Sequence, residues 1–197
     1  MLAVSYTGQP GEAGVDEAGR GCLAGPVVAA AVILPPDASL PGLTDSKQLS
    51  HAQRMTLRPM IQEMAIAWNI GMASAGRIDE VNILQATYDA MHEAVAGLAV
   101  TPVFLSIDGN RFRPYPGIAH ACLVKGDSRL LSIAAASVLA KTYRDDLMDL
   151  LHAEYPQYGW NQNRGYPTQA HREALLAWGP SPCHRRSFRW QAPLTLF

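Results

Sequence analysis

Residues 13–21 read Ala-Gly-Val-Asp-Glu-Ala-Gly-Arg-Gly, a short apolar stretch followed by two acids and a glycine-rich turn. The segment Ala13–Asp16 has the length of a short strand. Ala18–Gly21 predicts a tight turn after it, because glycine adopts backbone conformations that other residues avoid. Such a strand delivers Asp16 and Glu17 to its end, where the ligands of α/β sheets tend to bind.

Four further stretches combine strand length with apolar composition. They are Val27–Leu34, Ile66–Met72, Val103–Ile107 and Ala119–Val124. Acids follow the last two of these stretches, Asp108 directly and Asp127 after Lys125 and Gly126. The pattern of the first strand, with an acid at its end, is therefore repeated twice.

Helical patterns occupy much of the remaining chain. Ser50, with Gln53 three residues later, predicts a capped helix start. Helical spacing extends over Arg77–Leu98 and Leu131–Glu154, and Thr168 can cap a shorter helix up to Trp178. Strands come first as a group and then alternate with helices, which predicts an α/β fold with a mixed sheet and helices on its faces.

Net charge gives no sign of a nucleic-acid-binding surface. The formal net charge is −1, and 48% of the residues are hydrophobic, which is enough for a core. The segment 164–189, however, carries five arginines against a single acid, Glu173. It forms either a local cationic patch or a solvated surface with a chance run of arginines.

The cysteines Cys22, Cys122 and Cys183 are odd in number and widely spaced, so neither a disulfide framework nor a zinc site is expected. The first ten residues lack the features of a secretory signal. The apolar run Pro26–Leu34 is too short to span a bilayer. We expect a cytoplasmic protein that does not enter the membrane, and nothing in the sequence indicates more than a monomer.

Asp16, Glu17, Asp108 and Asp127 each lie near a strand end and close to glycine. Like charges brought together there cost stability unless a cation neutralises them. All-oxygen ligands favour Mg²⁺ or Mn²⁺ over zinc, and such ions support phosphodiester cleavage.

An ordinary structural role for each acid is the alternative. Each could cap a turn or a helix, and Asp127 could be the N-cap of the helix that follows. Asp16 and Glu17 would also point to opposite faces of a regular strand, and could share a site only if the strand bends or ends there.

Gly14–Gly21, continuing through Leu23–Val27, closely resembles the bacterial ribonuclease HII family. The resemblance recurs in family order at blocks that together run from residue 14 to 188, nearly the whole chain. These blocks are Thr44–Ser50, Asp108–Asn110, Lys125–Asp127, Ile133–Ser137 with Ala140 and Lys141, Gly165–Thr168, and Ser181-Pro182 with His184–Phe188. Each block is weak alone, but the ordered set is highly specific.

The resemblance implies a ribonuclease H-like fold, a five-stranded mixed sheet flanked by helices with a C-terminal helical extension. Residues 1–190 would form one catalytic domain, with a helical arm from about residue 160. The implied activity is endonucleolytic cleavage of RNA in RNA–DNA hybrids, and incision 5′ to a single ribonucleotide in duplex DNA. The ends left would be a 5′-phosphate and a 3′-hydroxyl.

Matched residue by residue, the four acids look like the family's catalytic, metal-binding carboxylates. Gly19, Arg20 and Gly21 look like its loop that contacts the ribose 2′-hydroxyl, the one group that distinguishes RNA from DNA. Tyr166 looks like the tyrosine that stacks on the following deoxyribose.

Basic residues are the candidates for contacts to the nucleic-acid backbone, which position a duplex without reading its bases. Lys47 is assigned to substrate binding, and Arg164, Arg185 and Arg186 are possible phosphate contacts. Two departures from the family pattern lie next to these candidate substrate-binding residues. Cys22 replaces a usual proline, which is expected to loosen the turn, and Asn163-Arg164 replaces a common His-Lys pair.

The last seven residues, Gln191–Phe197, form an apolar tail. The ending Leu-Thr-Leu-Phe resembles the peptides by which bacterial replication and repair proteins bind the sliding clamp. The alternative is that Leu194, Leu196 and Phe197 fold back onto the core.

Two other functions fit parts of this pattern. A junction resolvase or another nuclease would keep the fold and change the substrate, since fold alone does not fix function. A non-catalytic binder of hybrid duplexes is the second, but it would gain nothing from crowded negative charge facing phosphates. A Rossmann-type enzyme is excluded, because no G-x-G-x-x-G follows the first strand.

Overall fold

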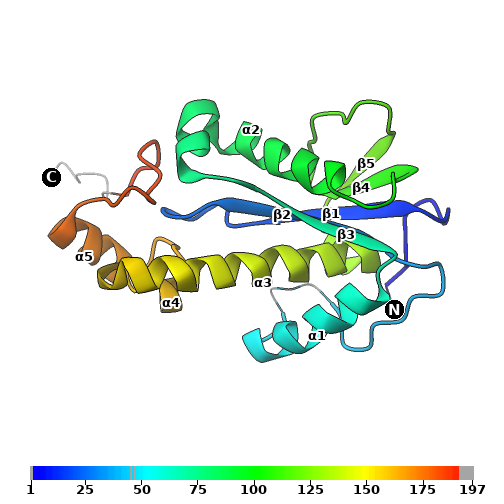
Figure 1. Cartoon of the computed structure of the whole chain (residues 1–197), viewed down its shortest axis with the longest axis horizontal. Coiled ribbons are helices and arrows are strands. Elements are labelled where there is room, and N and C mark those ends of the chain that lie inside the picture. Colours follow the sequence, from blue (N-terminus) through cyan, green and yellow to red (C-terminus); the bar gives the residue numbers. More distant parts are fainter. Residues whose placement is uncertain (1, 45, 47, 191–197) are drawn as a thin grey trace, which may run out of the picture.

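The computed structural model describes residues 2–44, 46 and 48–190, which fold around one five-stranded sheet (Figure 1). The strand order is β3-β2-β1-β4-β5, with β1–β2 and β2–β3 antiparallel and β1–β4 and β4–β5 parallel. The strands are β1 (Glu12–Ala18), β2 (Val27–Ile33), β3 (Ala67–Ala73), β4 (Phe104–Asp108) and β5 (His120–Leu123). The expected five-stranded mixed sheet is confirmed.

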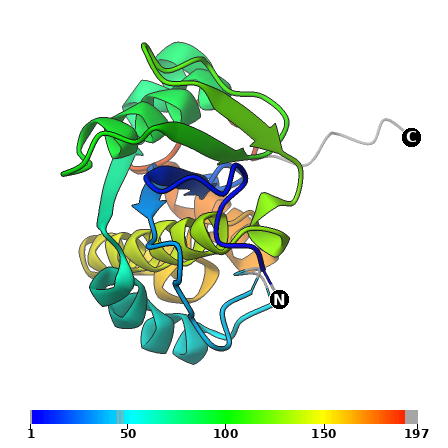
Figure 2. The same ribbon diagram turned by 90° about the vertical axis from the view of Figure 1, so that its right-hand side faces the viewer.

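Helices cover both faces of the sheet, giving the three layers seen end-on in Figure 2. One face carries α2 (Ala75–Ala96), and the other carries α1 (His51–Met64) and the long α3 (Leu131–Glu154). The predicted bounds of α3 are confirmed. The predicted capping box is also present at α1, where Ser50 accepts from the amide of Gln53 and Gln53 accepts from that of Ser50.

The central strand β1 alternates its side chains between the two helical layers, as a regular strand must. Ala13 and Val15 belong to the core shared with α2. Gly14 faces α3 so closely that a Cβ atom there would lie 2.3 Å from the carbonyl carbon of Ser132. Because glycine permits this approach, α3 passes directly beside the position of Asp16.

The helix α2 differs from the uninterrupted helix expected over Arg77–Leu98. It begins at Ala75, and Asn82 has φ 68° and ψ 163°, so the helix is kinked there. The side chain of Asn82 accepts hydrogen bonds from the amides of Leu84 and Gln85, and so restarts the helix after the kink. The sequence contains no proline at this point, and the change of direction was not anticipated.

The expected C-terminal arm packs back onto the C-terminal half of α3. It consists of the short helices η2 (Pro156–Tyr158) and α4 (Trp160–Asn163), then α5 (Gln169–Trp178) and the segment up to residue 190. A separate apolar cluster joins this arm to Leu23 and Ala24, just before β2. The turn that follows β1 is thereby held between the sheet and the arm.

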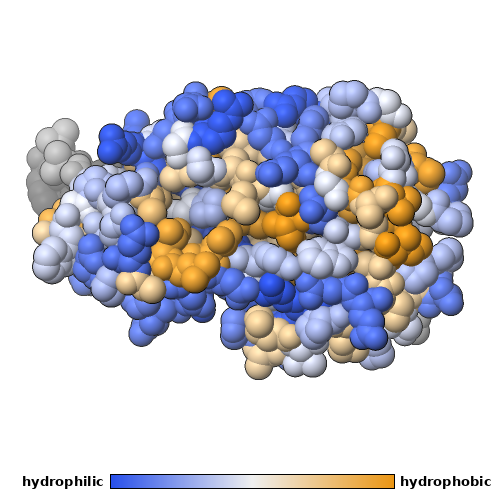
Figure 3. Space-filling model, in the orientation of Figure 1, coloured by the Kyte–Doolittle hydropathy of each residue, from blue (hydrophilic) through white to orange (hydrophobic). Residues whose placement is uncertain are grey.

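Apolar side chains gather on the face shown in Figure 3, over the C-terminal half of α3 and along the edge strand β3. A groove of about 780 Å³ there is lined by residues such as Met72, Leu150 and Cys183. None of the four acids lines this groove. No helix in the described part of the chain is long and apolar enough to cross a membrane.

Candidate active site

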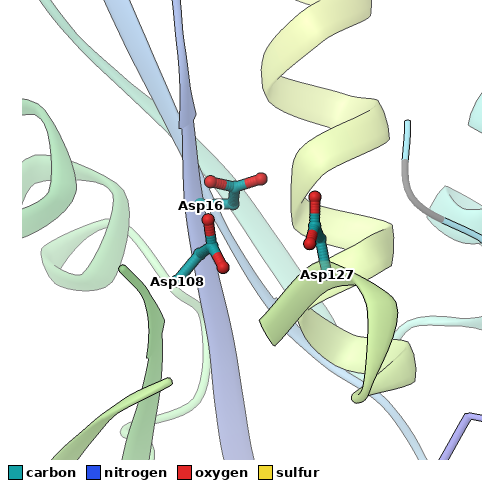
Figure 4. A group of neighbouring side chains, drawn as sticks. All are labelled: Asp16, Asp108 and Asp127. Carbon is teal, nitrogen blue, oxygen red and sulfur yellow. The ribbon is translucent and has the colours of Figure 1, made fainter. Parts of the chain in front are cut away.

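Asp16, Asp108 and Asp127 come together at one end of the parallel strand pair β1–β4 (Figure 4). Each offers a carboxylate oxygen, and these oxygens lie within 4.8 Å of one another. Asp16 comes from β1, Asp108 is the last residue of β4, and Asp127 lies in the 3-10 turn η1 (Gly126–Ser128) before α3. Three chain segments that are distant in sequence thus deliver three acids to one point.

Local hydrogen bonds fix this convergence. The Gly126 amide donates to Oδ1 of Asp108 at 2.7 Å, which ties the end of β4 to the turn that carries Asp127. Lys125 has the left-handed conformation that begins this turn. The helix α3 starts at Leu131 with Leu130 as its N-cap residue, so Asp127 is not the N-cap of α3.

Glu17 lies on the other side of β1, because the strand continues regularly to Ala18. Its side chain lines a hollow of about 320 Å³ together with Arg20, Tyr88 of α2 and Asp108. Nη1 of Arg20 donates to Oε1 of Glu17 at 3.0 Å, while the buried Oε2 has no hydrogen-bond partner in the described part of the chain. The structure therefore brings three of the four expected acids together and places the fourth beside Asp108.

Burial and like charge perturb these acids in the same direction. Burial, then the charges of Glu17 and Asp108, raise the pKa of Asp16 well above its ordinary value. Burial also raises the pKa of Glu17, against the opposing charge of Arg20. An oxygen-bound divalent cation would relieve the repulsion and satisfy the free Oε2, so the residues present fit Mg²⁺ or Mn²⁺.

The turn after β1 and the side chain of Tyr166 lie next to each other. The Cys22 amide donates to the Gly19 carbonyl oxygen at 3.3 Å, which closes the turn. A proline could not donate this bond. The expectation that Cys22 loosens the turn stays a prediction. Tyr166 is 40% exposed, and its hydroxyl lies beside the buried thiol of Cys22.

The basic residues expected at phosphates are placed differently from one another. Arg185 is 1% exposed, with its guanidinium bonded to backbone carbonyls, so the expected phosphate contact is corrected to an internal role. Arg164 forms an ion pair with Asp149 and donates to the Asp145 carbonyl. Arg186 is exposed, and Lys47 lies outside the described residues.

Several internal polar residues that hold the site together were not anticipated. Ser137 of α3 lies beside Asp16 and acts to lower its pKa, and the Ser137 hydroxyl is 2.7 Å from that of Ser46. The buried imidazoles of His171 and His184 are 3.1 Å apart at their Nε2 atoms, and Nδ1 of His171 is 2.9 Å from the Tyr166 carbonyl oxygen. Ser137 and His184 stand within the ordered sequence blocks, but nothing in their spacing reveals what they contact.

Comparison with known proteins decides the family. The family model described as Ribonuclease HII matches residues 13–191. The chain belongs to the ribonuclease HII family. A ribonuclease HII of Porphyromonas gingivalis is 59% identical over 178 residues, covering 90% of this chain and 89% of that protein. Enzymes of this family are endonucleases that cleave RNA in RNA–DNA hybrids, and they use divalent metals.

Solved structures of archaeal relatives share the fold of this chain. The ribonuclease H2 of Pyrococcus horikoshii is 25% identical with a TM-score of 0.75, covering 91% of this chain and 94% of that one. The Archaeoglobus fulgidus enzyme, solved as a PCNA:RNase HII complex, is 25% identical with a TM-score of 0.74 and covers 92% and 96%. The ribonuclease H-like fold expected from the sequence is thus confirmed.

Proposed function

We propose that this protein incises duplex DNA on the 5′ side of a single embedded ribonucleotide, and that Asp16, Glu17, Asp108 and Asp127 carry the catalytic metal. The observation that carries the proposal is the convergence of three carboxylates, one of which, Asp108, lines a hollow together with Arg20 of the Gly19–Gly21 turn. The cut leaves a 5′-phosphate and a 3′-hydroxyl. Both ends follow when water attacks phosphorus and the 3′-oxygen leaves.

Asp16, Asp108 and Asp127 would hold Mg²⁺ or Mn²⁺, with Glu17 contributing its free oxygen from the other side of β1. When bound, such ions activate water and stabilise the leaving oxygen. The chain itself fixes the acids: the Glu17 amide donates to Asp16, and the Gly126 amide donates to Asp108. These donors keep the oxygens oriented before substrate arrives, which is the protein's main contribution at such a site.

The Gly19–Gly21 turn would select the ribose. A Cβ atom built at Gly21 meets no atom within 4 Å, so a sugar can approach the backbone of the turn closely there. The exposed ring of Tyr166 would stack on the next sugar, where an added hydroxyl would be crowded. Lys141 Nζ and the Arg144 guanidinium lie 5.8 and 5.9 Å from the centre of this ring, which helps to hold the ring in place.

Contacts to phosphates would position the duplex. Arg186 is exposed, and its backbone amide is fixed by donation to Asp79 at 2.9 Å. Lys47 is proposed for the same role from the sequence alone. Arg164 is proposed too, although its pairing with Asp149 occupies part of its guanidinium.

The test uses a labelled DNA duplex with one ribonucleotide, incubated with the wild-type protein and Mg²⁺ or Mn²⁺. The expected product is a nick 5′ to the ribonucleotide, with a 3′-hydroxyl that a polymerase extends. An all-DNA duplex and a four-way junction serve as controls. Equal cutting of either control would instead support a nuclease of different specificity, and tight binding without any nick would support a non-catalytic binder.

We also propose that the tail 191–197, which lies outside the described residues, binds a sliding clamp. The sequence of the tail supports this, as does the Archaeoglobus relative solved with PCNA. Deleting residues 191–197 should abolish binding to a bacterial clamp and leave cleavage of a short duplex unchanged. Unchanged clamp binding, or unfolding of the truncated protein, would contradict the proposal.

A further inference from the structure

The buried side chain of Arg185 reaches back from the C-terminal arm to the turn after β1. Its Nη2 donates to the Gly19 carbonyl oxygen at 2.7 Å, Nη1 to that of Arg20 at 2.8 Å, and Nε to that of Gly25 at 3.0 Å. All three nitrogens of the guanidinium group thus donate to backbone carbonyls of the segment between β1 and β2. A lysine has no such fixed fork of donors.

These bonds determine where the amide groups of the turn point. A trans peptide directs its carbonyl oxygen and the following N–H to opposite sides, and the described chain has no cis peptide. With the Gly19 and Arg20 carbonyls turned inward to Arg185, the N–H groups of Arg20 and Gly21 face outward. Neither of these N–H groups donates a hydrogen bond within the described part of the chain.

The backbone beside Arg185 is held on the same turn by a second set of bonds. The Arg185 amide donates to the Leu23 carbonyl at 2.8 Å, and the Gly25 amide donates to the Cys183 carbonyl at 2.9 Å. Hydrogen bonds therefore hold Arg185 at its backbone as well as at its guanidinium group. Because both are fixed, the guanidinium keeps the backbone of the turn in one position.

Burial of the Arg185 cation costs free energy of solvation. No acidic side chain forms an ion pair with Arg185 in the described residues, and burial lowers its pKa to about 10. The group stays protonated at neutral pH, so its charge is stabilised mainly by carbonyl dipoles. An isolated buried charge is retained only with good hydrogen bonds, and here every bond goes to one short stretch of chain.

We propose that Arg185 is a positioning residue for ribose recognition, which aims the paired N–H groups of Arg20 and Gly21 at the 2′-hydroxyl of the substrate. The inference rests on the proposed function of the turn. It assigns to the buried arginine a part in selectivity that goes beyond holding the arm in place. Arg185 touches the turn and acts through it, without contact to substrate.

The test compares Arg185→Lys with the wild type on a single-ribonucleotide duplex and on the same duplex with a 2′-fluoro nucleotide at that position. We expect kcat on the ribonucleotide to fall between about ten- and a hundredfold, because a misplaced contact costs that much. KM should stay within about twofold, since phosphate contacts dominate affinity. The preference for 2′-hydroxyl over 2′-fluoro should fall with kcat, and the Mg²⁺ midpoint should not move.

Arg58→Lys is the matched control, because Arg58 is a largely buried arginine that pairs with Asp146 away from the turn. Its cleavage and its 2′ preference should equal those of the wild type. An Arg185→Lys variant with unchanged kcat, or with reduced kcat and an unchanged 2′ preference, would overturn the proposal. If the wild type does not nick the single-ribonucleotide duplex, the proposed function fails, and kcat and KM are then compared on a long RNA–DNA hybrid.

A measurement on the wild type covers the case in which Arg185→Lys does not fold. In ¹⁵N relaxation, the amides of Arg20 and Gly21 should have order parameters near 0.85, the value of rigid backbone. The same amide protons should exchange rapidly with water, because they are not hydrogen-bonded. Order parameters below about 0.6 would show a mobile turn and contradict the positioning role.

Discussion

A methyl group added at Gly19 would lie 1.9 Å from Nε of Arg144. Arg144 is fully buried and donates to the carbonyls of Ala24, Pro26 and Arg164, so it cannot move aside cheaply. Gly19 also has φ +93°, a conformation that strains other residues. The turn that is proposed to read the ribose is therefore built so tightly that its first residue can only be glycine.

We predict that Gly19→Ala lowers the free energy of unfolding by at least about 2 kcal/mol, from backbone strain and displacement of Arg144 together. Gly42→Ala is the matched control. Gly42 has φ +84° but no neighbour within 4 Å, so strain alone should cost about 1 kcal/mol. Urea unfolding measures the free energy of unfolding of both variants. Equal losses would show that the contact between the added methyl group and Arg144 does not destabilise the protein.

At the scale of elements, the kink in α2 arises at a single unfavourable residue. Asn82 occupies a region of backbone conformation that is essentially reserved for glycine, and its side chain caps the helix that restarts after it. The part of α2 after the kink contributes Leu84 and Tyr88 to the hollow beside Glu17. The kink thus shapes one wall of the candidate site.

Two substitutions at Asn82 separate its strain from its capping bonds. Asn82→Ala should destabilise the protein by about 1–2 kcal/mol, because it loses the cap and keeps the strain. Asn82→Gly should leave the stability nearly unchanged or raise it. A glycine at the cap costs only a few tenths of a kcal/mol, and the backbone strain disappears. Thermal unfolding compares them, and a glycine variant less stable than the alanine variant would refute this account of the kink.

A pair of neutral histidines in the arm is joined by a hydrogen bond to the backbone of Tyr166, a proposed substrate-binding residue. Trp160 donates to Nε2 of His171, so Nδ1 carries the proton and donates to the Tyr166 carbonyl. The Ser181 amide donates to Nδ1 of His184, whose Nε2 then donates to His171. A proton added to either ring would remove an acceptor that this chain of bonds requires.

This pair predicts a loss of stability in mild acid. Burial lowers the pKa of both histidines, that of His184 to about 4. In the unfolded chain these histidines bind protons near pH 6.5. The neutral pair therefore contributes fully to the free energy of unfolding above that pH, and this contribution is lost as the pH falls toward 4.

Urea unfolding at pH 7.5, 6, 5 and 4.5 measures the effect, with His184→Gln as the test and the exposed His51→Gln as the control. The dependence on pH should weaken in His184→Gln and persist in His51→Gln. An identical pH dependence in all three proteins would show that the pair does not titrate as described.

At the scale of the whole molecule, local sequence patterns and the family resemblance predicted most of the fold. The five strands, the bounds of α3 and the capping box at Ser50 follow from apolar spacing and turn chemistry. Glu17 shows the limit of such patterns. Residue alternation predicted that it points away from the face of Asp16, but not that its carboxyl group still interacts with Asp16 and lies beside Asp108. The proposed role of Arg185 depends on contacts between residues 160 or more positions apart in the sequence, which no local pattern contains.

The proposed function requires the cluster of Asp16, Asp108 and Asp127 to hold the metal that cuts the RNA strand. Its most direct test is the single-turnover cleavage rate of Asp108→Asn on an RNA–DNA hybrid with saturating protein and Mg²⁺. Asparagine keeps an acceptor for the Gly126 amide, so folding and duplex binding should be preserved. The rate should fall by more than about a hundredfold, since even outer-shell changes at metal sites cost 10–100-fold. A rate within about twofold of the wild type would contradict the assignment of the active site.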